Sequence, residues 1–131
     1  MERWDIAVVG TGPAGISAAV TATVRGKRVL LLGSRDLSQK MRKAHTVLNY
    51  PGLPNVSGNE LADAFARHIE SMGIAVTEKR ISAVYAMGDY FALASGDDMM
   101  EASSVILACG VVPGKPLPGE EELLEIGRAH V

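Results

Sequence analysis

Two different spacings of apolar residues divide this chain of 131 residues into two parts. Up to residue 78, short continuous apolar runs predict buried parallel strands at residues 6–9, 28–32 and 74–78. Between these runs, apolar residues recur at helical spacing and predict helices at residues 13–25 and 57–72. Strands that alternate with helices predict an α/β fold with right-handed βαβ crossovers.

From residue 81 onward, the pattern changes to short strands that are separated by turns. Residues 81–87, 90–95 and 99–102 are predicted strands, and glycine-aspartate pairs between them are typical of hairpins. They predict a three-stranded antiparallel β-meander laid over the parallel sheet. A further buried strand is predicted at residues 105–110, and its carboxyl end should lie at the same edge of the sheet as that of the first strand.

A long stretch without a regular period, residues 36–54, precedes the second helix. Ser57 and Glu60 form a capping box that marks where this helix begins. Loops of this length in compact domains tend to be functional. The stretch and its flank carry a basic cluster, which either lines an anionic cofactor or forms a solvated face. The members of this cluster are Arg35, Lys40, Arg42, Lys43 and His45.

Composition narrows the classes of function. The chain is 47% hydrophobic, enough for the core of one domain, and its formal net charge is −2. This charge gives no basic footprint for nucleic acid, and no apolar run approaches the length of a membrane span. The single cysteine, Cys109, excludes an internal disulfide, a CxxC redox pair and a cysteine-rich zinc site. We expect a cytoplasmic protein with no nucleic-acid or membrane partner and no metal site.

The clearest chemical signal is the sequence GTGPAG at residues 10–15, between the first predicted strand and the first predicted helix. Gly10 allows a tight turn, Gly12 lets a phosphate approach the backbone, and Gly15 lets the helix pack close to the strand. Pro13 fits the first helical turn, where its missing N–H costs nothing. The free amides and the dipole at the start of the helix favour a pyrophosphate, so this segment predicts a dinucleotide site.

The end of the second strand leaves two interpretations open. Dinucleotide-binding folds usually carry an acid there, about 20 residues past the glycines, to bind the adenosine ribose. This chain has Gly33, Ser34 and Arg35 instead. An arginine without the acid is expected for the 2′-phosphate of NADP, but Arg35 is equally consistent with a solvated loop cation.

Taken together, the motifs resemble those of thioredoxin reductase and its flavoprotein relatives. The resemblance rests on GTGPAG, NYPGLP, the β-meander, VILACG and LPGEEEL in this order, and it extends over residues 5–124. It implies a Rossmann-like FAD-binding domain in which the glycines hold the FAD pyrophosphate. It also implies that Asn49 lies against the flavin, that the backbone of Cys109 and Gly110 approaches the cofactor, and that Ile81 lies near the adenine.

Several positions depart from the family pattern. Gly33 replaces the ribose-binding acid, so that contact must come from Ser34 or from backbone. Lys40 stands where the family has glutamine, Leu48 replaces a glutamate, and Cys109 replaces a threonine and is interpreted as a small buried residue without a redox role. The candidate cofactor-binding residues are Gly10, Gly12, Pro13, Ala14, Gly15, Gly33, Ser34, Lys40, Asn49, Ile81, Cys109 and Gly110. No residue is predicted to be catalytic.

In the family, a second dinucleotide domain for NADPH follows, with a CxxC pair, and the chain then returns to the FAD domain with a final strand. This sequence contains no second glycine motif, no CxxC and no returning strand. We therefore expect residues 1–124 to be a partial FAD-binding domain that is incomplete at its C-terminus. Residues 126–131 back-translate to a common sequencing adapter, so residues 125–131 are expected to be a non-native tail.

The expected function is that of the FAD-binding part of a longer oxidoreductase, for which the family resemblance implies a homodimer. In the parent protein, hydride would pass from NAD(P)H to FAD and electrons would continue to a disulfide or another acceptor. The fragment alone is not expected to complete this cycle. Two alternatives are a stand-alone NADP-binding Rossmann module and an inert truncation product.

Overall fold

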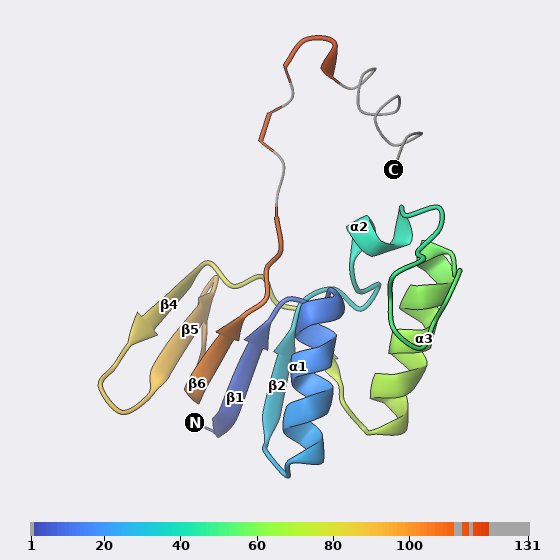
Figure 1. The fold of residues 1–131 in the computed structure, drawn as a ribbon. Helices are drawn as coiled ribbons and strands as arrows, with labels where there is room; N and C mark the ends of the chain where they lie inside the picture. Colours follow the sequence, from blue (N-terminus) through green and yellow to red (C-terminus); the bar gives the residue numbers. More distant parts are fainter. Residues whose placement is uncertain (1, 112–113, 116, 121–131) are drawn as a thin grey trace.

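The computed structural model describes residues 2–111, 114–115 and 117–120, which build a six-stranded sheet with helices on one face (Figure 1). The elements are β1 (Arg3–Val9), α1 (Pro13–Val24), β2 (Val29–Leu32), α2 (Gln39–Arg42), α3 (Gly58–Ser71), β3 (Val76–Thr77), β4 (Ala83–Ala86), β5 (Phe91–Ser95) and β6 (Asp98–Leu107). The sheet order is β3-β2-β1-β6-β5-β4. Strands β3, β2, β1 and β6 are parallel, whereas β6, β5 and β4 form an antiparallel meander. The predicted α/β class, with its parallel sheet and three-stranded meander, is confirmed.

Two hydrophobic clusters lie on opposite faces of the sheet because side chains along a strand point alternately to either side. On the helical face, Val8 and Leu31 are buried against Ile16 of α1 and Phe65 of α3. On the other face, a second cluster joins strands of the parallel part to the meander. Its buried members are Ala7, Leu30, Leu32, Leu93 and Ala102.

The prediction of two separate strands at residues 99–102 and 105–110 is wrong, because β6 is one continuous strand of ten residues. Ser103 and Ser104 interrupt the apolar pattern, yet both are exposed on the strand, and the Ser104 hydroxyl donates to the Asp5 carbonyl at 2.9 Å. The first half of β6 pairs with β5 and most of its length pairs with β1. The meander is therefore continuous with the parallel sheet, although the second cluster still packs Leu93 of β5 against that sheet.

The end of β6 also differs from the prediction of a buried strand. The strand ends at Leu107, and the exposed fractions of Ile106 and Leu107 are 38% and 68%. The reason is that β5 pairs with residues 98–102 only. Within the described ranges, β1 is the only strand that pairs with the rest of β6.

The stretch at residues 36–54, predicted to be irregular, contains the short helix α2, whose first turn is capped by Ser38. The Arg42 side chain fastens this helix to its surroundings by donating to the Asp36 carbonyl at 2.7 Å and to Asn59 Oδ1 of α3 at 3.3 Å. Gly58 lies where a Cβ would collide with the Met41 carbonyl, so the start of α3 packs closely on α2. This packing fixes the position of α2 beside the sheet.

The structure confirms one other predicted boundary and shortens one predicted strand. The capping box is confirmed, since Ser57 Oγ accepts the Glu60 amide at 3.1 Å at the start of α3. The predicted strand at 74–78 shortens to the two residues of β3. The predicted domain boundary at residue 124 and the tail at 125–131 lie outside the described residues. Within those residues, no helix has both the length and the hydropathy to cross a bilayer.

Helix α1 approaches β1 so closely that only a glycine fits at position 15. A Cβ on Gly15 would collide with the backbone carbonyl of Gly10, where β1 ends. At Gly12, by contrast, the nearest atom to an added Cβ is the Ser38 Cβ at 3.8 Å. Gly15 is therefore required for the packing of α1 on β1, whereas Gly12 leaves open space beside the turn.

We expect Gly15→Ala to lower the free energy of unfolding by about 1–3 kcal/mol, because the methyl group forces α1 away from β1. Gly12→Ala is the matched control, since its backbone (φ −80°) suits alanine and its Cβ meets nothing closer than 3.8 Å. It should lower stability by less than about 1 kcal/mol, the cost of a poorer N-cap residue without a steric clash. Urea denaturation followed by circular dichroism measures both values. Equal losses in the two variants would contradict this account of the packing.

We expect this protein to self-associate through β6, along the edge that faces away from β1 beyond residue 102. Residues 103–111 contain no charge and no proline, the usual protections of an exposed edge, and they include the exposed Ile106, Leu107 and Val111. We expect the mass measured by light scattering to rise with protein concentration. Ile106→Lys should reduce this rise, because a lysine on an edge strand opposes pairing.

Val24→Lys is the matched control for this experiment, because Val24 is also an exposed apolar residue but lies at the end of α1. This variant should associate like the original chain. A chain that stays monomeric at all concentrations, or an Ile106→Lys variant that associates like the original chain, would show that self-association does not occur through this edge of β6.

Candidate dinucleotide-binding site

The candidate site is built where the carboxyl ends of β1 and β6 lie side by side. The Ala108 amide donates to the Val9 carbonyl at 2.8 Å, and the Gly10 amide donates to the Leu32 carbonyl of β2 at 2.8 Å. Gly10 has a φ of +123°, and a Cβ there would collide with the Ala108 carbonyl. A glycine is therefore needed to turn the chain at this point. The predicted common edge of the two strands is confirmed.

The start of α1 presents unpaired backbone donors to this edge. Gly12 is the N-cap residue and Pro13 is the first helical residue. The first helical hydrogen bond runs from the Ile16 amide to the Gly12 carbonyl at 3.0 Å, so the amides of Ala14 and Gly15 have no acceptor within the helix. The first turn carries no acidic residue that would offset the positive end of the helix dipole. This geometry suits an anionic group such as a phosphate.

A groove with a volume of about 1090 Å³ runs along this edge, between the glycine turn, the α2 segment and the end of β6. Its volume is slightly above the usual range of ligand pockets, roughly 300–1,000 Å³. Seven of the predicted cofactor-binding residues line it: Gly10, Gly12, Pro13, Ala14, Lys40, Cys109 and Gly110. The structure thus brings together residues that lie up to 100 positions apart in the sequence.

The other predicted residues lie elsewhere. Gly15 is buried beneath the turn, and Gly33 and Ser34 follow the end of β2. Asn49 is exposed and does not line the groove, although its neighbour Tyr50 does. Ile81 packs against the second hydrophobic cluster, on the face of the sheet without helices.

Several lining residues were not identified from the sequence. They come mostly from the apparently irregular stretch: Leu37, Ser38, Gln39, Met41, Ala44, Val47 and Tyr50. The Tyr50 ring packs edge-on against Phe65 of α3, with ring centroids 5.1 Å apart. The apolar residues that recur in this stretch could have identified it, because they indicate that it packs against the core of the domain.

Thr11 is a further residue that the sequence did not single out. Its buried hydroxyl accepts the Ser34 amide at 3.2 Å and lies 3.2 Å from the carbonyl oxygens of Ser34 and Leu37, to which it can donate. It therefore joins the glycine turn to the segment after β2. Beside that segment, Glu78 Oε1 accepts the Arg35 amide at 2.9 Å, and Glu78 Oε2 lies 3.9 Å from Arg35 Nε.

Two expectations about side chains need correction. Cys109 is exposed, not buried, because it lies beyond the end of β6, with its Sγ 3.7 Å from the Val9 carbonyl. The basic cluster does not act as a unit: Lys40 lines the groove, whereas Arg42 binds α3 residues. Among the described residues, no group of three or more potential metal ligands is found.

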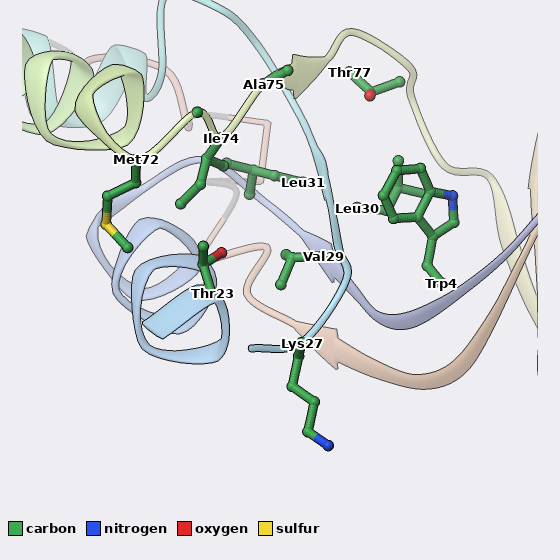
Figure 2. A pocket seen from close by; sticks show the side chains of 11 residues that line it. Trp4, Thr23, Lys27, Val29, Leu30, Leu31, Met72, Ile74, Ala75 and Thr77 are labelled. Atoms are coloured by element: carbon green, nitrogen blue, oxygen red, sulfur yellow. The ribbon is translucent and has the colours of Figure 1, made fainter. Parts of the chain in front are cut away.

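A second cavity, of about 240 Å³, lies near the opposite ends of the strands (Figure 2). Met72, Ile74 and Thr23 surround it on the helical side of β2, while the Lys27 side chain points away. The cavity is small, and no helix begins among its described lining residues, so it offers no helix start to bind an anion and the groove is the candidate site.

Comparison with known proteins gives a consistent family. The family model described as pyridine nucleotide-disulphide oxidoreductase matches residues 4–130. Thioredoxin reductase from Bacillus subtilis is 30% identical over 121 residues, which are 92% of this chain and 38% of that protein. A protein from Clostridium pasteurianum, named as a 34.2 kDa protein in a rubredoxin operon, is 30% identical over 124 residues, 93% of this chain and 40% of its own length.

Solved structures agree. A ferredoxin-flavin thioredoxin reductase from Clostridium acetobutylicum superposes with a TM-score of 0.86 at 50% identity, covering 95% of this chain and 44% of its own. Thioredoxin reductase from Lactococcus lactis gives a TM-score of 0.81 at 30% identity, covering 94% and 41%. The chain therefore spans about two fifths of the length of these relatives. It belongs to the pyridine nucleotide-disulphide oxidoreductase family, in which it corresponds to the FAD-binding region of thioredoxin reductases.

Proposed function

We propose that this chain binds FAD in the groove, as the FAD-binding part of a longer flavoprotein oxidoreductase of the thioredoxin reductase type. The observation that supports this most strongly is the continuity of the groove with the glycine turn and the start of α1. An extended ligand with a pyrophosphate in its middle suits a groove that has an anion site along its length.

Different residues of the chain would bind different parts of FAD. The amide of Ala14, which lines the groove, would donate to the pyrophosphate, and the open space at Gly12 would let its oxygens come close to the backbone. Lys40, the charged residue that lines the groove, would offset part of the phosphate charge. The backbone after β6, at Cys109 and Gly110, would lie beside the flavin half.

The apolar part of the lining suits an aromatic ring system. Leu37, Met41 and Tyr50 offer apolar surface on the α2 side of the groove. Bound FAD would accept electrons from a donor and pass them to a disulfide or another acceptor. The protein's contribution is position and electrostatics, and no described residue is assigned as an acid, a base or a nucleophile.

The donor in the longer protein has two candidates. The expectation from the sequence is NAD(P)H. The 50% identical structure, however, is named as a ferredoxin-flavin thioredoxin reductase, whereas the Lactococcus lactis and Bacillus subtilis thioredoxin reductases are 30% identical. This higher identity favours reduced ferredoxin as a second candidate donor.

An NADP-binding module remains the alternative binding function. A 2′-phosphate on Arg35 would also lie near the Glu78 carboxylate, whose two oxygens are 2.9 Å and 3.9 Å from Arg35 nitrogens. A phosphate bound to Arg35 would therefore be repelled by the neighbouring Glu78 carboxylate, so FAD is the better supported ligand. The partial domain at 1–124, the non-native tail, the cytoplasmic location and the homodimer of the longer protein stay predictions.

The proposal is tested by the visible absorbance of the purified chain after incubation with FAD and removal of free flavin. We expect about one FAD per chain. Gly12→Ala should bind FAD roughly tenfold or more weakly, because the added methyl group takes the space of a phosphate oxygen and forfeits charge-assisted hydrogen bonds.

Ser17→Ala is the control, because Ser17 is an exposed residue of the same helix. It should bind FAD like the original chain. A folded but colourless chain would contradict the proposal, and if that chain bound NADP, the Rossmann-module alternative would replace it.

A further inference from the structure

The segment after β2 has no room for the acid that dinucleotide-binding folds usually carry there. Position 33 is a glycine, and a Cβ on it would lie 2.5 Å from Thr11 Cγ2 and 2.6 Å from Thr11 Oγ1. Thr11 cannot easily move away, because its side chain is buried and its hydroxyl bonds the backbone of Ser34. Thr11 and Gly33 are therefore matched, and a carboxylate at position 33 is sterically excluded.

A carboxylate reaches the same place from the neighbouring strand. The Gly33 amide donates to the Thr77 carbonyl at 3.1 Å, so the residue that follows Thr77 lies beside the end of β2. That residue is Glu78, and its Oε1 accepts the Arg35 amide at 2.9 Å. The side chain thus reaches from the residue after β3 to the segment after β2.

The Glu78 carboxylate keeps capacity for a ligand. Its side chain is 49% exposed, and its second oxygen is 3.9 Å from Arg35 Nε, beyond hydrogen-bond distance. A carboxylate offers about four acceptor positions, of which the Arg35 amide occupies one. The next residue anchors the segment, since Lys79 Nζ lies 2.9 Å from Asp98 Oδ2.

We propose that Glu78 accepts the adenosine ribose hydroxyls of the bound dinucleotide, in place of the acid that β2 lacks. This inference rests on the proposed FAD function. Ile81, which the family resemblance links to the adenine, lies three residues further along the same segment. The negative charge of Glu78 also selects an unphosphorylated ribose over one with a 2′-phosphate.

The test compares FAD with an analogue that carries 2′,3′-dideoxyadenosine, using Glu78→Gln in the full chain. Glutamine keeps the shape and can still accept the Arg35 amide, so the fold should persist. We expect Glu78→Gln to weaken FAD binding about tenfold, because the neutral carboxamide replaces charge-assisted hydrogen bonds to the ribose with weaker neutral ones. The analogue lacks the hydroxyls, so it should bind the variant and the original chain equally.

Glu70→Gln is the matched control, because Glu70 is an exposed glutamate in the last turn of α3, two residues before Met72 of the second cavity. It should leave the affinity for FAD and for the analogue unchanged. Flavin fluorescence titration gives all the affinities.

Three other outcomes overturn the inference, and they separate it from the proposed function. Equal FAD affinity of the original chain and Glu78→Gln would overturn the role of Glu78 while the proposed function stands. An equal loss of affinity for FAD and for the analogue would mean that Glu78 only supports the structure. An original chain that binds no FAD would overturn the proposed function and this inference with it.

Discussion

The close approach of backbone to backbone at the ends of β1 and β6 determines the rest of the site. Neither Gly10 nor Gly15 has space for a Cβ, because carbonyl groups of the turn and of the residue after β6 occupy it. This contact sets α1 directly against β1 and aims the free amides of its first turn along the sheet edge. A side chain at either position would separate the helix from the strand and widen the anion site.

The second constraint is the packing of α2, which forms the other wall of the groove. This helix has only four residues, too few to be stable alone, and it is fixed by Arg42 and by the glycine at the start of α3. Its position therefore depends on α3, which in turn packs through Phe65 on the core of the sheet. Stability and the shape of the site are coupled through these contacts.

Much of the fold and part of the site could be predicted from local patterns. The glycine turn, the capping box at Ser57 and the bounds of the two long helices depend on neighbouring residues, and the sequence predicts these helix bounds to within one residue. The continuity of β6 was missed because Ser103 and Ser104 break the apolar pattern, although exposed serines fit an edge. The exposure of Cys109 was missed because burial depends on which strands lie beside β6.

Contacts between distant segments could not be read from the sequence. Thr11 meets Ser34, and Glu78 meets Arg35, only because three parallel strands end at one edge. Sequence spacing indicated a missing acid at Gly33, but it gave no sign that the neighbouring strand supplies a carboxylate. Glu78 comes to lie beside Arg35 because β3 pairs with β2, and strand order of this kind cannot be predicted from local sequence propensity.

The most direct test of the central claim, that the groove holds the dinucleotide along the glycine turn, is an FAD titration followed by amide NMR. The account predicts that the amide resonances of Gly12, Ala14 and Gly110 shift together, whereas those of Met72 and Ile74 beside the second cavity stay in place. Saturable shifts confined to the second cavity, or binding that leaves the glycine turn unchanged, would contradict it.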